Sequence, residues 1–175
     1  MTGPFRLYPV EQRWWSMNDY GAVLDVMTRL QPSTVLEFGP GSSTLALIEG
    51  GAARIDCCED SPVWAATYRD RLVRRFPSIV RLVEYVWAEP LVIPAVNGCQ
   101  YDLALIDGPY GTERRPTVLE YCLARCQAVL MPTEDYKARG LRPAIAAIVA
   151  RLGLIVEWME TGPLSGGFAL VTRPC

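Results

Sequence analysis

Histidine is absent from this chain of 175 residues, and of the 17 lysines and arginines only Lys137 is a lysine. Histidine is the side chain that most often moves protons in enzymes, so a proton acceptor here must be an aspartate, glutamate, tyrosine or lysine. The 6 cysteines show no CxxC spacing. Because a zinc site would have to gather dispersed thiolates or carboxylates, we expect buried, reduced thiols and assign no metal site.

Long apolar runs and a strong net charge are also missing. No stretch approaches the roughly 18–20 apolar residues of a membrane span, and residues 1–6 contain no signal-peptide core. These absences predict a cytoplasmic protein with no membrane partner. The net charge of −2 gives no broad cationic surface, which disfavours nucleic acid as a partner. The length and the 50% hydrophobic content fit one domain with a substantial core.

The most informative feature present is a short apolar run that ends in a carboxylate and is followed by a tight glycine turn. Residues 34–44 read Thr-Val-Leu-Glu-Phe-Gly-Pro-Gly-Ser-Ser-Thr. Gly39 and Gly41 permit a sharp turn and a close approach of a ligand to the backbone, and Pro40 stiffens the turn. Hydroxyls and backbone N–H groups are then offered at a helix start by Ser42, Ser43 and Thr44. The pattern predicts a strand, a nucleotide-binding loop and a helix.

Glu37 makes this glycine pattern more specific. A carboxylate at the C-terminal end of a strand faces the edge where open α/β sheets bind ligands. It would repel a pyrophosphate and attract a cation, and S-adenosylmethionine carries an ammonium and a sulfonium. Alternatively, Glu37 only caps a neighbouring loop at the end of its strand.

Together with Gly39 and Gly41, Glu37 resembles the first motif of class I S-adenosylmethionine-dependent methyltransferases, Glu/Asp-x-Gly-x-Gly-x-Gly/Ser/Thr. The resemblance extends over residues 33–173, and the motif pattern is most similar to that of small-molecule O-methyltransferases. It implies that residues 39–44 wrap the amino-acid and ribose end of S-adenosylmethionine. It also implies that Glu37 binds the methionine ammonium, directly or through water.

Strand-like and helix-like segments alternate along the chain, which predicts an α/β protein with a parallel sheet covered on both faces. The last two strands are too close in sequence for a helical crossover, so that pair should be antiparallel. The resemblance implies a Rossmann-like sheet of seven strands in the order 3-2-1-4-5-7-6, after an N-terminal aromatic segment and helix in residues 1–32. The expected helices are 17–30, 43–50, 62–76, 116–126 and 141–152, and the expected strands are 34–38, 53–58, 79–87, 101–106, 128–131, 154–159 and 167–172.

Acidic residues end the second and third expected strands. Glu59 lies where an acidic residue holds the hydroxyls of a nucleotide ribose, and its alternative role is to cap the next loop. Asp60 is expected to be the N-cap of the helix that follows, although Ser61 could also cap it. Trp64 could cover an adenine or pack in the core. The resemblance implies that Glu89 reads the adenine amino group, whereas a surface glutamate is the alternative.

Asp107 ends the fourth strand in the sequence Leu-Ile-Asp-Gly-Pro-Tyr, which resembles the fourth motif of small-molecule O-methyltransferases. The same residues are also similar to the Asp/Asn-Pro-Pro-Tyr motif of amino-directed nucleic-acid methyltransferases, but Gly108 replaces a proline. Asp135 follows the fifth strand within Glu134-Asp135, which resembles an acidic pair of O-methyltransferases. Asp107 and Asp135 could therefore act as the proton acceptor for a hydroxyl or bind a hard cation such as Mg²⁺.

The sequence thus predicts transfer of a methyl group from S-adenosylmethionine to a small-molecule acceptor, at a hydroxyl oxygen. Three other functions stay open: a non-catalytic S-adenosylmethionine-binding module or partner subunit, a nucleic-acid amino methyltransferase, and an NAD-dependent oxidoreductase. An acceptor pocket could also require a homo-oligomer. The N-terminal segment contains an aromatic cluster of Phe5, Tyr8, Trp14 and Trp15. This cluster could close over the substrate, or it could pack the first helix on the sheet. Arg114 and Arg115 could receive an anionic substrate or be exposed without a role.

Overall fold

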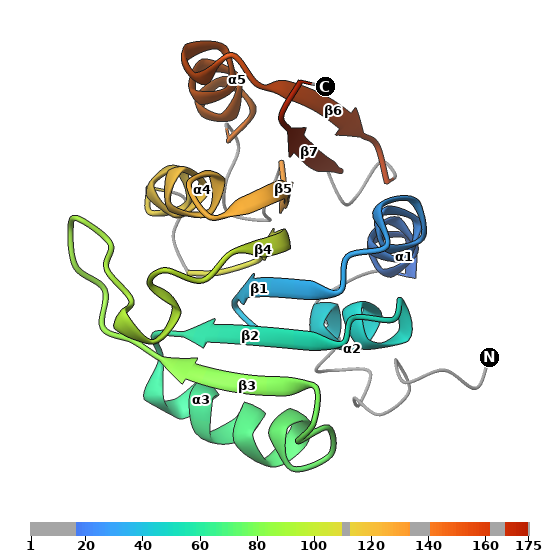
Figure 1. Cartoon of the computed structure of the whole chain (residues 1–175), viewed down its shortest axis with the longest axis vertical. Helices are drawn as coiled ribbons and strands as arrows, with labels where there is room; N and C mark the ends of the chain where they lie inside the picture. The colour runs from blue at the N-terminus through green and yellow to red at the C-terminus, as the bar shows by residue number, and fades with distance from the viewer. Residues whose placement is uncertain (1–16, 110–112, 134–140, 162–166, 175) are drawn as a thin grey trace.

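A single mixed sheet organises the molecule (Figure 1). The computed structural model describes residues 17–109, 113–133, 141–161 and 167–174, in which seven strands lie in the order β3-β2-β1-β4-β5-β7-β6. The first five strands of that order are parallel, and β7 is antiparallel to both β5 and β6. The expected sheet is therefore confirmed. The strands are β1 Thr34–Phe38, β2 Arg54–Glu59, β3 Val80–Glu84, β4 Tyr101–Ile106, β5 Cys126–Pro132, β6 Ile155–Met159 and β7 Phe168–Thr172.

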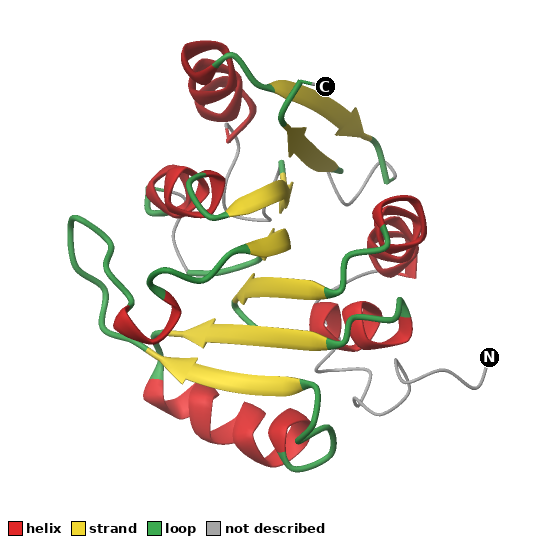
Figure 2. Cartoon of the chain, in the orientation of Figure 1, coloured by secondary structure: helices red, strands yellow, loops and turns green. Residues whose placement is uncertain are grey.

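Helices cover both faces of this sheet (Figure 2). One buried cluster joins α1, α2 and Leu72 to one face, while the other joins α4, α5 and the connection between β3 and β4 to the opposite face. Alternate residues of β1 divide between these clusters, with Val35 in one and Leu36 in the other, as the two-residue period of a strand requires. The helices are α1 Met17–Leu30, α2 Ser42–Glu49, α3 Pro62–Tyr68, α4 Arg115–Leu123 and α5 Leu141–Leu152.

Two expected helices differ from the structure by more than one residue at their ends. The helix expected over 62–76 is α3 followed by a π-helical turn, Arg69–Val73. The helix expected to reach residue 126 ends at Leu123, and Cys126 already belongs to β5, so the placement of Cys122 and Cys126 on one helix is wrong. The helix stops there because the Arg125 carbonyl accepts a hydrogen bond from Tyr101 N at the start of β4. Both thiols are reduced and buried, as expected.

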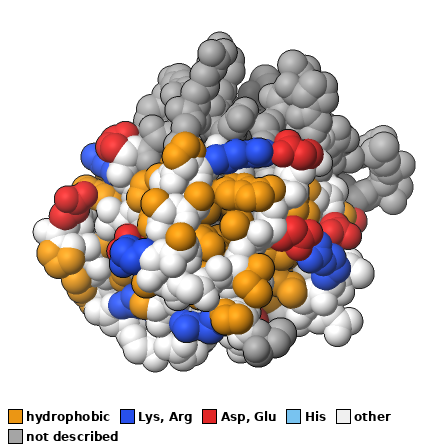
Figure 3. Space-filling model, turned by 90° about the horizontal axis from the view of Figure 1, so that it is seen from above, with side chains coloured by type: hydrophobic (Ala, Val, Ile, Leu, Met, Phe, Trp, Pro, Cys, Tyr) orange, Lys and Arg blue, Asp and Glu red, His pale blue; other side chains and the backbone are white. Residues whose placement is uncertain are grey.

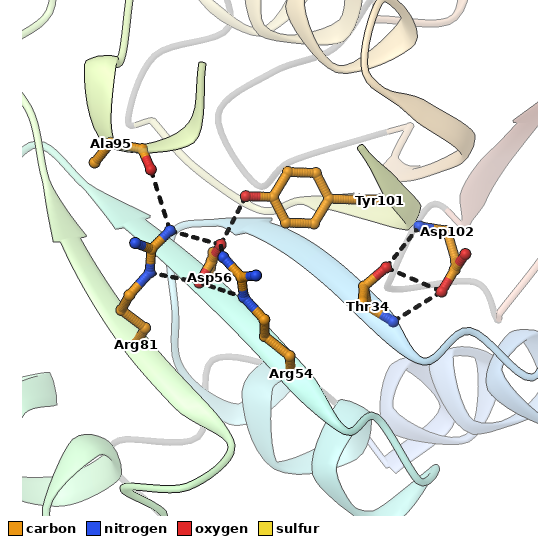
Figure 4. Close-up of polar contacts among 7 residues, drawn as sticks. All are labelled: Thr34, Arg54, Asp56, Arg81, Ala95, Tyr101 and Asp102. Atoms are coloured by element: carbon orange, nitrogen blue, oxygen red, sulfur yellow. Dashed lines mark hydrogen bonds and ion pairs between the residues drawn. The ribbon is translucent and has the colours of Figure 1, made fainter. Parts of the chain in front are cut away.

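The connection between β3 and β4 contains no α-helix, only the short 3₁₀ turn Pro94–Val96. An ion cluster around the buried carboxylate of Asp56 lies next to this connection (Figure 4). Asp56, with no exposed surface, accepts two hydrogen bonds of 2.7 Å from Arg81 and one of 2.7 Å from Tyr101 Oη. Arg54 also pairs with Asp56, and Arg81 donates to the Ala95 carbonyl at 3.2 Å. The cluster therefore ties the connection to the sheet.

A second polar contact aligns the beginnings of β1 and β4 (Figure 4). Asp102 Oδ2 accepts hydrogen bonds from Ser33 N, Thr34 N and Thr34 Oγ1 at 2.8–3.0 Å. Three donors to one carboxylate favour its charged form, so the pKa of Asp102 lies below its usual range. The contact holds the register of the two central strands, whose opposite ends carry the candidate site.

Hydrophobic side chains also gather on the surface formed by α5 and β6 at the top of Figure 1, as the view from above in Figure 3 shows. Leu152 is 44% exposed and Ile155 is 53% exposed. In the described part of the chain, no helix is both long and apolar enough to cross a membrane.

Candidate functional site

The candidate site lies at the C-terminal ends of β1, β2 and β4, which are neighbours in the sheet. The strand order reverses between β1 and β4, and ligands of open α/β sheets bind at such a switch point. The turn of residues 39–41 follows β1, Glu59 ends β2, and Asp107 follows β4 directly. The residues predicted from the sequence around these three strands are therefore brought to one edge.

The turns after β1 and β4 touch through their backbones. Gly39 has φ +76°, and a Cβ placed on it would lie 2.6 Å from Gly108 N. A Cβ on Gly108 would in turn lie 2.9 Å from Gly39 Cα, so both positions need glycine. Phe38 O accepts hydrogen bonds from Asp107 N at 2.8 Å and Gly108 N at 2.7 Å, which locks the two turns together. The sequence motif indicated Gly39, but the requirement at Gly108 is visible only in the structure.

Space remains beside the second glycine of the turn. Among the described residues, a Cβ built on Gly41 meets no atom closer than Tyr68 Oη, at 4.0 Å. Ser42 is the first residue of α2, and its hydroxyl is buried without a hydrogen-bond partner among the described residues. An orphaned buried hydroxyl next to an open backbone position is what a polar ligand can satisfy.

Glu37 is completely buried, and its carboxylate points to the start of α2 rather than to the surface. Oε1 accepts a hydrogen bond from Ser43 Oγ at 2.6 Å, and Oε2 accepts one from Thr44 Oγ1 at 2.7 Å. The Cys57 thiol on the neighbouring strand donates to Oε2 at 3.2 Å. Glu37 thus occupies the predicted place, and hydroxyls and a thiol of its own chain surround its carboxylate.

Burial dominates the ionisation of this group. Loss of solvent raises the pKa of Glu37 to about 7, although its three hydrogen bonds lower it, and the nearby charge of Asp107 raises it further. Burial also raises the pKa of Glu59, with a smaller contribution from the adjacent charge of Asp60. Carboxylates that repel one another at one edge of the sheet favour a ligand with positive charge over a pyrophosphate.

Glu59 and its neighbours shape the part of the edge beyond β2. Glu59 Oε1 accepts a hydrogen bond from Ser61 N at 2.9 Å, so one of its oxygens caps the loop. The N-cap of α3 is Ser61, whose hydroxyl accepts from Trp64 N, and the expectation for Asp60 is wrong. Asp60 lies instead 3.4 Å from Arg114 Nη1, in an ion pair. Trp64 is 45% exposed and stacks on Tyr68, so it does not pack in the core.

Two arginines at the start of α4 have structural contacts that the sequence did not indicate. The guanidinium of Arg114 lies over the Trp87 ring, 5.1 Å from its centroid, while it pairs with Asp60. Arg115 is buried and donates from Nη2 to the Asp107 carbonyl at 2.8 Å. Neither is an exposed arginine without a role. Glu89, in contrast, is exposed on the connection after β3, and its role as an adenine contact stays a prediction.

Some predicted residues lie outside the described part of the chain. They are Phe5, Tyr8, Trp14, Trp15, Tyr110, Glu134, Asp135 and Lys137. The role of Asp135 therefore stays a prediction. Among the described residues, no group of three His, Cys, Asp or Glu side chains could hold a metal ion.

Comparison with known proteins finds matches to the fold but none to the sequence. No protein-family model and no curated protein matches the sequence. Solved structures do match: an O-methyltransferase from Bacillus cereus in complex with S-adenosylhomocysteine (SAH) aligns with a TM-score of 0.71 at 16% identity, over 91% of this chain and 82% of that chain.

Two further structures contain bound S-adenosylmethionine. An amino pentose methyltransferase from Micromonospora echinaspora has a TM-score of 0.68 at 13% identity, over 94% of each chain. The magnesium protoporphyrin IX methyltransferase from Synechocystis has a TM-score of 0.66 at 13% identity, over 90% of this chain and 81% of that chain. The chain therefore has the fold of class I S-adenosylmethionine-dependent methyltransferases.

Proposed function

We propose that this protein is an S-adenosylmethionine-dependent methyltransferase that acts on a small-molecule hydroxyl. The observation that supports this function most directly is the glycine turn at the switch point between β1 and β4, with Glu59 and Asp107 at the adjoining strand ends. Negative charge around an open backbone turn suits an ammonium and a sulfonium, and it disfavours the pyrophosphate of NAD.

The described residues fit this cofactor. Within the described part of the chain, the space beside Gly41 is open, so the backbone of the turn can approach the ligand closely. The Ser42 hydroxyl, which has no partner there, offers a donor and an acceptor. Glu59 uses Oε1 to cap its loop, and its remaining acceptor capacity suits the two hydroxyls of a ribose. When bound, S-adenosylmethionine supplies a methyl group that its sulfonium has already activated.

Asp107 is the candidate base that removes the proton from the substrate hydroxyl. It extends from the end of β4, held by its backbone N–H on Phe38 O and by Arg115 on its carbonyl. Alignment of the two reactants can supply about 7–11 kcal/mol in such a transfer, so the two hydrogen bonds that hold the Asp107 backbone support this role. We assign the second carboxylate to Asp135, and the preference for oxygen is supported by the likeness to the Bacillus cereus O-methyltransferase.

Calorimetry tests the cofactor first. We expect the protein to bind SAH and not NAD, and the Glu59→Gln variant to bind SAH at least about tenfold more weakly, because a neutral amide holds the ribose hydroxyls less well. Glu157→Gln, on the exposed edge strand β6, is the matched control and should bind as the wild type does. Failure to bind SAH would refute the proposal.

Turnover tests the activity. A screen of catechols, other phenols, sugars and amines, with labelled S-adenosylmethionine, should give label transfer to a hydroxyl compound. Transfer only to amines would refute the choice of oxygen. Tight binding of SAH without transfer to any acceptor class would identify a cofactor-binding module instead of an enzyme.

A further inference from the structure

Three consecutive hydroxyl residues begin α2, and the structure uses them differently. Ser43 and Thr44 have no exposed surface and donate to the two oxygens of Glu37. Ser42 is nearly buried, and its hydroxyl meets no partner within the described residues. The three hydroxyl residues look equivalent in the sequence, but among the described residues only Ser42 has a hydroxyl left for an additional contact.

Thr44 has a second contact that links Glu37 to the glycine turn. Its Oγ1 donates to Glu37 Oε2 at 2.7 Å and accepts from Gly41 N at 2.9 Å. One hydroxyl thus joins the buried carboxylate to a backbone N–H of the turn. Because the first N–H groups of a helix region lack intrahelical partners, this bond decides how that part of the turn is oriented.

The opposite side of the turn is fixed independently. Gly39 N donates to the Cys58 carbonyl at 3.1 Å, and Gly39 packs directly against Gly108. Gly39 is therefore held by backbone contacts to β2 and to the turn after β4. Gly41, in contrast, donates its N–H to the Thr44 hydroxyl. Removal of this hydroxyl would release one end of the turn and leave the other in place.

We propose that Thr44 is a positioning residue for the cofactor site, which transmits the position of Glu37 to Gly41, and that Ser42 is the hydroxyl that contacts the ligand. The proposal rests on the proposed function and deepens it. In this arrangement Glu37 acts through Ser43 and Thr44 as an internal anchor of the turn. The direct contact between Glu37 and the methionine ammonium, implied by the family resemblance, is then not required.

Two ligands separate these roles. SAH contains the amino-acid end with its ammonium, whereas 5′-methylthioadenosine keeps the nucleoside and the thioether sulfur without that end. A residue that orients the turn should affect both ligands by the same factor, and a residue that binds the ammonium should affect only SAH. The ratio of the two dissociation constants in each variant therefore reports the role.

We expect Thr44→Val to bind both ligands about tenfold more weakly, because the variant loses the two hydrogen bonds of the Thr44 hydroxyl. Thr44→Ser, which keeps the hydroxyl, should stay within about twofold of the wild type. Thr28→Val is the matched control, because the Thr28 hydroxyl donates to a carbonyl within α1 and is exposed. Equal ligand affinity in Thr44→Val and the wild type, or no rescue by Thr44→Ser, would overturn the proposal.

Glu37→Gln provides a second test if Thr44→Val does not fold. We expect it to weaken SAH and 5′-methylthioadenosine by the same factor. Loss of SAH affinity alone would show a direct contact with the ammonium and would overturn the role assigned to Glu37. Ser42→Ala should weaken SAH, and unchanged SAH affinity would refute the ligand contact of that hydroxyl.

Amide hydrogen exchange distinguishes failure of this proposal from failure of the proposed function. It needs no ligand: the Gly41 amide should be protected in the wild type and in Ser42→Ala, and it should exchange at least about tenfold faster in Thr44→Val. Unchanged protection in Thr44→Val would refute the link from Thr44 to Gly41 even if SAH binds. If the Gly41 amide exchanges faster in Thr44→Val but the protein binds neither ligand, the contact from Thr44 to Gly41 is supported and the proposed cofactor is refuted.

Discussion

Replacement of Glu37 by glutamine removes a buried group whose ionisation opposes folding at neutral pH. Burial raises the pKa of Glu37 from about 4.5 to about 7. Between these values the folded protein keeps a proton that the unfolded chain has already released. The stabilising contribution is therefore fully present below about pH 4.5 and is lost as the pH rises through 7.

The magnitude follows from the two pKa values. One pKa unit corresponds to about 1.4 kcal/mol, so the full shift represents on the order of 3 kcal/mol. Between about pH 5.5 and pH 8.5, the titration of Glu37 lowers the free energy of unfolding by about 2 kcal/mol. Glutamine has nearly the same shape and does not titrate, so Glu37→Gln should gain about 2 kcal/mol relative to the wild type over this range. For a chain of this size, this corresponds to a difference of about 4–8 °C in Tm.

Urea denaturation of both proteins at several pH values measures this difference. Only its change with pH matters, because the loss of hydrogen-bond geometry in the variant is the same at every pH. Glu157→Gln is the control with the opposite sign: its hydrogen bond from Arg29 lowers the pKa of Glu157, so that residue stabilises the fold above its unfolded pKa and loses the effect in acid. A difference between Glu37→Gln and the wild type that stays constant from pH 5.5 to 8.5 would refute the buried, proton-binding carboxylate.

Three further predictions concern the scaffold and can be checked by urea denaturation. Gly39→Ala should lower the free energy of unfolding by at least about 2 kcal/mol and abolish SAH binding, because a positive φ and a backbone clash act together. Gly51 has φ +95°, but among the described residues no atom lies within 4 Å of an added Cβ, so Gly51→Ala should lower it by only about 1 kcal/mol. Equal losses in the two variants would refute the clash. Asp56→Asn should destabilise the fold by about 2 kcal/mol, a value reduced because its arginine partners are about half exposed. The pKa of Asp56 lies below its usual range because hydrogen bonds from Arg81 and others outweigh the burial that would raise it. Its contribution should therefore be lost as the pH falls below about 4, and a cost that is unchanged in acid would contradict this. Arg29→Ala should lower the free energy of unfolding by less than about 1 kcal/mol, because the ion pair with Glu157 is exposed. The effect should shrink in high salt, and a larger loss of stability that does not depend on salt would contradict this.

Local pattern was sufficient to predict the elements. The strand of residues 34–38 and the helix of residues 17–30 have the expected bounds, because an apolar run before a glycine turn and a helical period before Pro32 are signals within one short window. Boundaries failed where a distant contact decides them. The helix before β5 ends early because the Arg125 carbonyl pairs with Tyr101, 24 residues earlier.

The candidate site was predictable as a set of positions and not as a set of contacts. Glu37, Glu59 and Asp107 are each identified by the end of a strand, and the parallel sheet brings such ends to one edge. The direction of each carboxylate is a different matter. Glu37 accepts hydrogen bonds from α2 and β2, and Asp60 leaves the N-cap to Ser61 and pairs with Arg114.

The sequence by itself determined which segments are strands and helices, the turn that glycine makes possible, and the acidic character of the edge where the strands end. These properties depend on backbone sterics and on side-chain periodicity over a few residues. Only the tertiary structure decided that Gly39 must touch Gly108, that Thr44 stands between Glu37 and Gly41, and that burial raises the pKa of Glu37. Close approach and loss of solvent arise from the packing of distant segments, and no local pattern contains them.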